Sequence, residues 1–540
     1  MPPGWGAVKG KGGRPCTCQS PGVTSTFAVP PAACVADQSG RYRPVPPKLR
    51  PRHPRTGHPN ALSPSPETPL SDVTSAPPRP LHFAAFVMNT TGHIIQGTWR
   101  RPAAHQANFN DLDHWVSLAR LLERGKFDAV FFADVVGLYA PYRGDERKYF
   151  EAGLQVPSND PSVLASALAY VTEHLGIAFT ASVLQEHPFN FARRISTLDH
   201  ASKGRIAWNI VTNYLPNASR NFGLDGLTKH DERYAWADEY VDVTYKLWEG
   251  SWEEDALRQD RAAGIHADYG KVHRIFHEGP RYKVEGPHLV SPSPQRTPLL
   301  FQAGASEAGR TFAAKNAEAV FITAPNLAAA SRDTTDIRAR AVRHGRRPDD
   351  IKFFQGLFVV PAATEAEAKR KAAELDDWID WDGQISHMSG SLGIDFGFDD
   401  LDTPLGELKT EGVQSAVGWI KDLVPDRPAT LRDVARFTAS NTRIVGTPEQ
   451  IADKLARWQA AGVDGVNLIN AEIPGSYEDF VDHVAPELQR RGLMQREYAA
   501  GTLRNKLFGR GDRLPGRHPA ARYRGAFAPQ PVSQSVSQSA

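Results

Sequence analysis

Cysteine is almost absent from this sequence. Its 540 residues include three cysteines, Cys16, Cys18 and Cys34, and none follows Cys34. Disulfide bonds and thiol chemistry therefore contribute nothing to the long remainder of the chain. Cys16 and Cys18 are separated by one residue and lack the roughly four suitably spaced ligands of a zinc site. We therefore expect no bound metal ion.

Long apolar runs and a strong net charge are missing as well. No run of about 20 apolar residues occurs, so the sequence predicts no membrane span. The formal net charge is +2, with 41% apolar and 23% charged residues, which is the composition of an ordinary soluble protein. We expect neither nucleic acid nor a membrane as a partner. We also expect a cytoplasmic location, because the first residues lack the compact apolar segment of a secretory signal.

The beginning of the chain differs from the rest in proline and charge. Residues 1–80 hold 18 of the 42 prolines, together with ten Lys and Arg and three Asp and Glu. They carry a net +7, so the other 460 residues carry −5. Proline interrupts helices and sheet ladders, and the apolar residues here recur without a period. We predict that residues 1–79 form a disordered, basic, proline-rich tail, either a linker arm or sequence upstream of the true start.

Beyond residue 80 the sequence alternates between apolar segments and helical patterns. Eight segments have the character of buried strands: 81–87, 127–134, 177–183, 205–212, 299–301, 319–322, 351–361 and 463–469. Amphipathic helices separate them, and one begins with a capping box formed by Thr447 and Gln450. Alternating β and α elements predict a parallel sheet, and eight such units favour a (β/α)8 TIM barrel over an open sheet.

Two parts of the predicted barrel differ from its regular alternation: residues 251–297 have no clean period, and residues 362–442 look mostly helical but irregular. We assign the barrel to residues 80–507, with insertions at 251–297 and 362–442, and we assign 508–540 to a C-terminal arm and flexible tail. In such a barrel, residues at the C-terminal ends of the strands face the active site. Those ends are therefore the places to look for chemistry.

Polar residues lie within or directly after three of the predicted strands. Asp134 ends the second strand, and it is either a site carboxylate or a helix cap or surface ion-pair partner. Thr180 lies within the third strand, where it is either a hydroxyl facing the barrel mouth or a β-branched filler. Asn209 and Asn213 lie within and after the fourth strand. A buried Asn needs a hydrogen-bond partner, which is either a ligand or a neighbouring group.

A small-residue turn follows the fifth strand. Gly304, Ala305 and Ser306 lead from an apolar run into an alanine-rich helix. The free N–H groups at a helix N-terminus in the second half of a barrel commonly bind phosphate. His230 and Tyr234 lie four residues apart on one helix face, and the phenol of Tyr234 is either a phosphate donor or part of the core.

These segments together resemble the bacterial-luciferase-like flavin monooxygenases, in the group with long-chain alkane, dimethyl-sulfide and nitrilotriacetate monooxygenases. The resemblance covers residues 81–524. It rests on segments such as "FVMNTTGHIIQGTWRRP" (86–102), "ARRISTLDHASKGRIAWNIVTN" (192–213) and "PSPQRTPLLFQAGASEAGRTFAAKNAE" (292–318).

The resemblance implies a luciferase-like barrel that uses FMN rather than NAD. By matching motifs, seven residues would contact the cofactor: Asp134, Thr180, His230, Tyr234, Gly304, Ala305 and Ser306. The FMN phosphate would then lie at the turn of Gly304 to Ser306, assisted by Tyr234.

The resemblance also implies a set of catalytic and substrate residues. His93 in the first loop, Tyr139 in the second and Tyr214 after the fourth strand are the catalytic candidates. Thr90, Gln155 and Asn213 are assigned to the substrate pocket. We expect His93 to hydrogen-bond the reacting oxygen or the substrate, because an unperturbed imidazole titrates near neutral pH, unless it only orders the loop.

Two positions depart from the group's pattern. Thr90 stands where the alkane and sulfide enzymes have Cys, and Tyr214 stands where the alkane enzyme has His and the sulfide enzyme Tyr. Both positions line the substrate side, so the pattern does not single out alkanes as substrates.

The implied activity is that of a two-component monooxygenase. It would use FMNH2 from a separate NAD(P)H:flavin reductase, with O2 as co-substrate, to oxygenate a small, mostly apolar molecule such as an alkane or organic sulfide. A homodimer or homotetramer is expected. Two alternatives stay open, a deazaflavin-dependent dehydrogenase on the same barrel and a flavin-binding protein without turnover.

Overall fold

The computed structural model describes residues 34–36, 42–44 and 79–529. Within the last range it leaves out 140–141, 305, 398–399, 403, 406–409, 411–419, 421, 423, 425 and 441. The chain divides into two units, Met1–Thr74 and Ser75–Ala540. In the first unit, β1 (Cys34–Ala36) pairs antiparallel with β2 (Tyr42–Pro44). The rest of the predicted tail lies outside the described residues.

Eight parallel strands close into a barrel in the second unit. They are β3 (His82–Met88), β4 (Ala129–Ala133), β5 (Gly176–Ser182), β6 (Ile206–Val211), β11 (Leu299–Gln302), β12 (Ala319–Ile322), β13 (Lys352–Pro361) and β15 (Gly465–Ile469). Each strand pairs with the next one, and β15 pairs with β3 to complete the circle. The predicted (β/α)8 barrel and all eight of its strands are confirmed.

Side chains alternate between the barrel interior and the surrounding helices. Ala84 and Phe86 of β3 belong to the interior cluster, whereas Phe83 and Val87 belong to the layer between strands and helices. Aromatic rings fill the interior, and Phe301 lies 5.2 Å from Phe131 between ring centroids. The barrel is therefore a packed core below its mouth rather than a pore.

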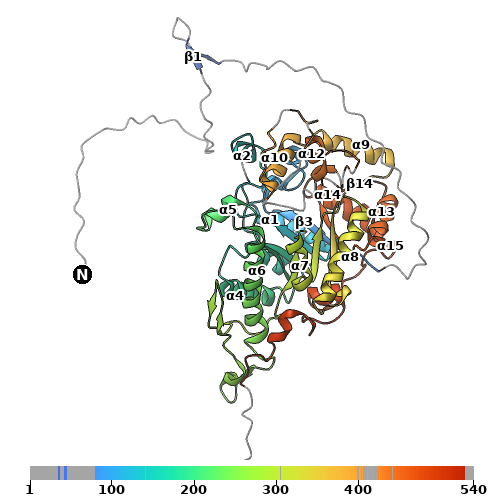
Figure 1. Ribbon diagram of the computed structural model, residues 1–540. Helices are drawn as coiled ribbons and strands as arrows, with labels where there is room; N and C mark the ends of the chain where they lie inside the picture. Colours follow the sequence, from blue (N-terminus) through green and yellow to red (C-terminus); the bar gives the residue numbers. More distant parts are fainter. Residues whose placement is uncertain are drawn as a thin grey trace, which may run out of the picture. The chain divides into compact units, whose positions relative to one another are not determined.

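Helices surround the barrel in sequence order (Figure 1). The principal ones are α1 (Leu112–Arg124), α3 (Pro161–Val171), α4 (Pro188–Ala201), α6 (His230–Tyr245), α7 (Glu307–Asn316), α8 (Leu327–Arg343), α13 (Pro448–Ala460), α14 (Gly475–Asp479) and α15 (Ala485–Arg490). The predicted capping box is present, because Thr447 accepts from the Gln450 amide and Gln450 Oε1 accepts from the Thr447 amide. Within the described residues, no helix has the length and apolar character needed to cross a membrane.

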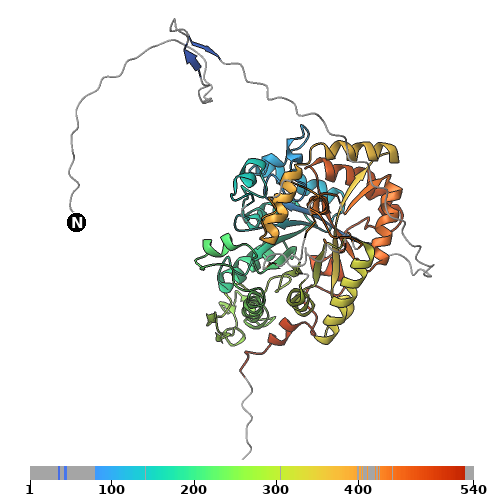
Figure 2. The same ribbon diagram turned by 45° about the horizontal axis from the view of Figure 1, so that its top comes forward.

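The described part of the second predicted insertion contains three helices. It includes α9 (Glu365–Asp376), α10 (Trp381–Leu392) and α12 (Leu431–Ser440). Directly after it, β14 (Arg443–Gly446) pairs in parallel with the end of β13, a strand that the sequence analysis missed. α10 packs against α12 and against α2 (Arg147–Ala152), and Figure 2 shows these helices around one end of the barrel.

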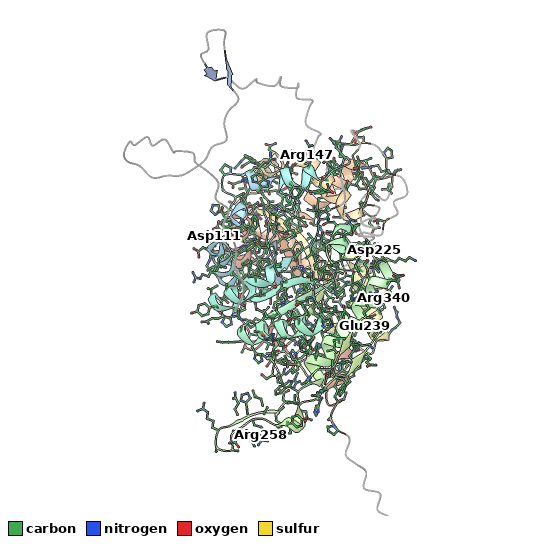
Figure 3. The ribbon with its side chains drawn as sticks, turned by 90° about the vertical axis from the view of Figure 1, so that its left-hand side faces the viewer. Asp111, Arg147, Asp225, Glu239, Arg258 and Arg340 are labelled. Carbon is green, nitrogen blue, oxygen red and sulfur yellow. The ribbon has the colours of Figure 1, made fainter. Side chains whose placement is uncertain are left out.

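The first predicted insertion consists of short hairpins. β7 (Leu257–Asp260) pairs with β8 (Ile265–Ala267), and β9 (His277–Glu278) pairs with β10 (Lys283–Val284). The hairpin that carries Arg258 extends away from the body of the barrel (Figure 3). α5 (Pro216–Asn221) lies between β6 and α6 in the sequence.

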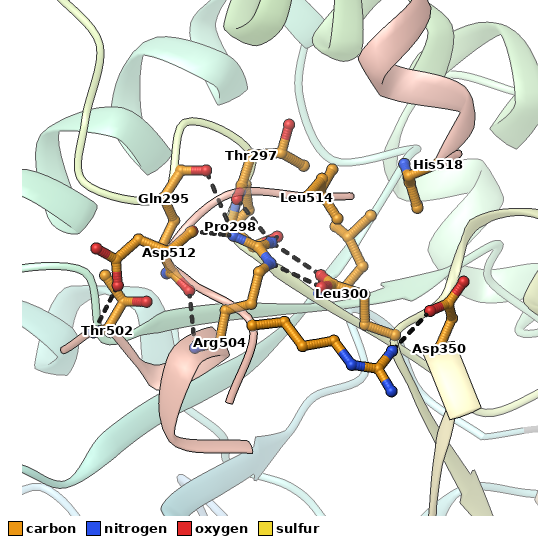
Figure 4. A network of polar contacts seen from close by, with 12 residues as sticks. Gln295, Thr297, Pro298, Leu300, Asp350, Thr502, Arg504, Asp512, Leu514 and His518 are labelled. Atoms are coloured by element: carbon orange, nitrogen blue, oxygen red, sulfur yellow. Dashed lines mark hydrogen bonds and ion pairs between the residues drawn. The ribbon is translucent and has the colours of Figure 1, made fainter. Parts of the chain in front are cut away.

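A buried ion pair closes the N-terminal end of the barrel. Arg504 of α16 (Leu503–Phe508) donates to both carboxylate oxygens of Glu318, at 2.7 and 2.8 Å, and both side chains are almost fully buried. The same guanidinium donates to the carbonyls of Thr297 and Pro298 (Figure 4). The segment after the eighth strand thus holds together the entrances of two earlier strands.

Candidate functional site

The predicted site residues lie at the C-terminal end of the barrel. Asp134 follows β4 and Tyr214 follows β6, while Gly304 and Ser306 follow β11. Thr180 and Asn209 lie two residues beyond Ala178 and Ala207, which line the interior, so both occupy inward-facing positions near the mouth. Ala305 lies outside the described residues.

The turn after β11 has the form of an anion cradle. Ser306 caps α7, and its hydroxyl oxygen accepts from the Gly309 amide at 3.1 Å. The amides of Glu307 and Ala308 belong to the first helical turn and therefore have no intrahelical acceptor. The carboxylate of Glu307 is paired with Arg340. The helix N-terminus thus offers N–H groups and a hydroxyl to an anion.

Tyr234 and two glycines shape this turn. Tyr234 shares hydrogen bonds with Ser306, Gln302 and Thr212, and burial raises the pKa of its phenol. A Cβ placed on Gly304 would lie 2.4 Å from Tyr234 Oη, and one on Gly309 would lie 2.7 Å from it. Glycine is therefore required at both positions for the phenol to reach the turn.

His230 begins the helix that carries Tyr234. The two rings lie 5.2 Å apart between centroids, and His230 Nδ1 contacts Asp231 Oδ1 at 2.9 Å. The structure thus brings His230, Tyr234 and Ser306 together.

Asp134 has an unusual titration at the barrel mouth. Burial, reinforced by the nearby charge of Asp160, raises its carboxyl pKa to about 7, and hydrogen bonds from the Val135 amide and Gln185 only partly oppose the rise. The alternative interpretations of Asp134, a helix cap or a surface ion-pair partner, do not fit, because no helix begins there and no ion pair involves it within the described chain.

Polar atoms without protein partners gather near the mouth. Thr180 Oγ1 donates to the Phe132 carbonyl and accepts from Asn209 Nδ2 at 2.9 Å. Within the described residues, several buried atoms have no partner at all: Asn89 Oδ1, Asn209 Oδ1, Gln302 Oε1 and Thr323 Oγ1. An unsatisfied buried polar group is costly, so this set fits a ligand with both donors and acceptors on its rim. The heterocyclic edge of a flavin is such a ligand.

A buried polar cluster joins the loops above the barrel. Tyr139 donates to Gln155 Oε1 at 2.5 Å, and its Oη lies 3.2 Å from Tyr214 Oη and 3.2 Å from His387 Nε2. Gln155 Nε2 lies 3.1 Å from His387 Nε2 and donates to the His93 carbonyl at 3.0 Å. Four of the predicted loop residues are thus brought together, and His387 joins them.

The cluster has one consistent assignment of protons. Gln155 Nε2 can only donate, so His387 Nε2 accepts from it and the imidazole proton lies on Nδ1. His387 Nδ1 has no acceptor within the described residues. An unmatched N–H donor therefore remains in the cluster, and it is available to a ligand.

The cluster carries no charge near neutral pH. Burial lowers the pKa of His387 to about 4. Burial raises the pKa of Tyr214 to about 12 and that of Tyr139 well above its ordinary value. The His387 imidazole and both phenols are therefore neutral.

The expected near-neutral titration of His93 is wrong. Burial and the neighbouring His387 lower the pKa of His93 to about 3. Its ring packs 4.6 Å from that of Phe86, and its Nδ1 has no partner within the described chain. At pH 7 His93 is a neutral hydrogen-bonding group and not a reservoir of protons.

Two residues assigned to the substrate pocket hydrogen-bond neighbouring loops. Thr90 Oγ1 donates to the Pro157 carbonyl at 2.6 Å and so joins the first loop to the segment after Gln155. Asn213 adopts φ 61°, and its side chain bonds the Leu215 backbone and Ser219. Both shape the loops around the cluster.

His387 is the functional candidate that sequence reasoning missed. It lies on α10, inside the segment treated as an irregular insertion. The available signal was the stretch "SHMSGS", where small residues flank a single His. A Cβ on Gly390 would lie 2.3 Å from Tyr139 Cβ, so the small residues allow α10 to approach Tyr139.

Comparison with known proteins decides the family. The family model described as luciferase-like monooxygenase matches residues 90–465. The chain belongs to the luciferase-like monooxygenase family. It is 45% identical over 447 residues to the long-chain alkane monooxygenase of Geobacillus thermodenitrificans, covering 82% of this chain and 98% of that one. It is also 45% identical over 448 residues to the dimethyl-sulfide monooxygenase of Hyphomicrobium sulfonivorans, covering 82% and 93%.

Solved structures of the family agree with the barrel. Riboflavin lyase, crystallised with modified FMN and riboflavin, superposes with a TM-score of 0.77 at 39% identity, covering 83% of this chain and all of that one. Enzymes of the family are flavin-dependent monooxygenases, and this chain is one of them. These relatives do not favour the two alternatives, a deazaflavin-dependent dehydrogenase and a non-catalytic flavin-binding protein.

Proposed function

We propose that this monooxygenase binds FMN in its reduced form and oxygenates a small, uncharged, mostly apolar molecule with O2. The observation that carries the proposal is the neutral cluster of Tyr139, Gln155, Tyr214 and His387 beside the partnerless polar atoms of the barrel mouth. When bound, reduced FMN supplies the reaction with O2 and the transfer of one oxygen atom.

The flavin phosphate would be held by the turn after β11. The N–H groups of Glu307 and Ala308, the Ser306 hydroxyl and the Tyr234 phenol are its donors. Thr180, Asn209 and Asp134 would hydrogen-bond the polar edge of the flavin ring. Asp134 can accept or donate a hydrogen bond near pH 7, because its pKa is about 7.

The cluster above the barrel would handle the substrate. Its buried position excludes water, and the neutral N–H of His387 can donate to a developing oxygen without carrying a charge. Tyr214, Tyr139 and Gln155 hold that imidazole in one tautomer. None of these four groups is cationic, so a multiply charged aminopolycarboxylate has no counter-charge among them.

Several further properties belong to the same proposal. Long-chain alkanes, organic sulfides and sulfones are the substrate classes suggested by the relatives' names. The name of another relative, nitrilotriacetate monooxygenase component A, suggests that a separate component completes the system. We propose a flavin reductase for that role here, in the cytoplasm, with a homodimer or homotetramer as the working enzyme.

The decisive experiment is a substrate panel under air. The purified chain would receive FMN and NADH with a generic flavin reductase, and an alkane, a dialkyl sulfide, a sulfone and nitrilotriacetate would be compared. Oxygenated product from an uncharged member, dependent on the chain and on O2, supports the proposal. Product from nitrilotriacetate alone, or none from any compound, contradicts it.

A matched pair of variants connects the result to the cluster. Tyr139→Phe removes the hydroxyl shared with Gln155, Tyr214 and His387 and should reduce product formation. Tyr149→Phe removes a neighbouring buried phenol, 5.6 Å away between ring centroids, that donates to the Ser386 carbonyl instead. Equal losses in both variants would mean that the cluster has no special role.

A further inference from the structure

A recess lined by arginine lies at the opposite end of the barrel from the proposed flavin site. Four arginines line it, Arg346, Arg504, Arg510 and Arg513, together with two acids, Glu318 and Asp350. The charged groups of the lining carry a formal +2.

Both acids of the recess already have hydrogen-bond or ion-pair partners. Glu318 receives two hydrogen bonds from Arg504 and one from the Leu300 amide. Asp350 is paired with Arg510 and with Arg517, which approaches from outside the recess. Neither carboxylate has a direct ion pair left for Arg346.

Arg346 is buried without a carboxylate partner of its own. Its side chain is 4% exposed, and its two terminal nitrogens donate only to the carbonyls of Ala314 and Asp350, at 3.0 and 3.1 Å. Its Nε has no acceptor within the described residues. A buried charge without a counter-charge is strongly destabilising, so this arrangement favours an external anion.

Other groups lie around the recess as well. His518 is buried beside Arg346, and burial together with that guanidinium lowers its pKa well below the ordinary value, so the imidazole is neutral and adds no charge. Arg510 and Arg513 stand nearer the solvent, 39% and 30% exposed, and each is ion-paired with a carboxylate outside the lining, Asp349 and Glu254. The unpaired charge of the recess is therefore that of Arg346.

We propose that this recess binds a small tetrahedral oxyanion of the phosphate and sulfate class. Arginine suits that class because its planar N–H groups match oxyanion geometry. The anion would neutralise the unpaired charge of Arg346 and join the segment after α8, the segment before β12 and the C-terminal arm. Because the recess lies at the N-terminal end of the strands, binding stabilises the fold and leaves the flavin site untouched.

The test separates this recess from the flavin-phosphate turn, which also attracts phosphate. Inorganic phosphate is titrated calorimetrically into the full-length Ser306→Asp variant, at constant ionic strength maintained with chloride. One binding site is expected to remain there. Absence of any site in this background would overturn the proposal.

Variants of the recess assign that remaining site. Arg346→Met should abolish it, and Arg510→Gln, at the exposed entrance, should weaken it about tenfold, the loss expected for one charged hydrogen bond. The matched control is Arg432→Gln, which removes a 36% exposed arginine paired with Asp402 far from the recess. If Arg346→Met fails to fold, the phosphate affinities of Arg510→Gln and Arg513→Gln are measured instead. Unchanged phosphate affinity in both would overturn the proposal.

Discussion

Tyr139 Oη lies 3.2 Å from His387 Nε2, although 248 residues separate the two in the chain. Tyr139 follows the second barrel strand, and His387 lies on α10, so the contact fixes that helix over the mouth of the barrel. The neutral imidazole it holds carries an N–H on Nδ1 that no described residue accepts.

Replacing His387 should uncouple the reaction. In His387→Leu the donor is lost while the flavin-phosphate turn is unchanged, so FMN affinity should stay near that of the wild type. Product formation should fall about 10²-fold, the usual size of one proton-handling contribution, and hydrogen peroxide release should rise. The ratio of product to hydrogen peroxide under steady FMNH2 supply measures this. His387→Asn, which keeps an N–H donor, should recover part of the product. An unchanged ratio in His387→Leu would make the residue purely structural.

Gly390→Ala should disturb the same contact by crowding. A methyl group there would lie 2.3 Å from Tyr139 Cβ, so either α10 or the tyrosine must move. Crowding of this kind costs about 1–3 kcal/mol of stability. The urea midpoint of unfolding and the yield of oxygenated product should both fall. Gly226→Ala places its methyl group in open space and serves as the control, and equal behaviour of the two variants would contradict the packing argument.

Ser306→Asp should weaken FMN binding strongly. It places a carboxylate at the helix N-terminus where the phosphate is proposed to bind, and like charges about 4 Å apart repel by roughly 1–4 kcal/mol, depending on the local dielectric. Fluorescence titration with FMN measures the loss. Ser306→Ala removes the cap of α7 without adding charge, so its FMN affinity should be reduced much less. Wild-type affinity in Ser306→Asp would place the phosphate elsewhere.

Asp134 should make stability depend on pH. Its pKa is raised to about 7 in the folded protein from 3.8 when unfolded, so the folded state holds the extra proton between those values. Stability associated with this group is therefore greatest below about pH 4 and is lost as the pH rises towards 7. Asp134→Asn cannot ionise, so it should not lose stability as the pH rises. The variant's gain in unfolding free energy over the wild type should grow from pH 5 to pH 8, and a constant difference would refute the raised pKa.

Removal of residues 1–78 should leave the enzyme intact. The barrel begins at β3, whose His82 pairs with Gly465 of the last strand, and Leu81 bonds the Leu493 carbonyl. A chain starting at Arg79 should therefore keep its thermal midpoint and its FMN affinity. Aggregated or flavin-free protein would show that the proline-rich segment contributes to folding.

The barrel could be predicted because its information is local. The eight strands are short apolar runs separated by helical periods, and such patterns need no knowledge of distant contacts. β14 (Arg443–Gly446) was missed because only two of its residues, Ile444 and Val445, form an apolar run. Its partner is the C-terminal end of the ten-residue β13, and local sequence does not reveal that distant pairing.

The candidate site shows the same difference between local sequence information and distant contacts. Asp134, Ser306 and Tyr234 could be named as candidates because Asp134 and Ser306 follow strands and Tyr234 lies near the start of a helix. Position alone left structural alternatives open, and the family resemblance supplied the proposed contact with FMN. His387 could not, because its place beside Tyr139 depends on how α10 packs over the mouth. The neutral state of His93 also required the structure, since burial and the second imidazole determine it.

The pairing of Arg504 with Glu318 also has a consequence for how the protein is made. Glu318 precedes the sixth barrel strand, but the residue that neutralises it is translated 186 residues later. Until α16 is synthesised, a carboxylate at the floor of the barrel lacks its counter-charge, and the entrances of β11 and β12 lack a shared anchor. This ion pair can therefore form only after all eight strands have been synthesised.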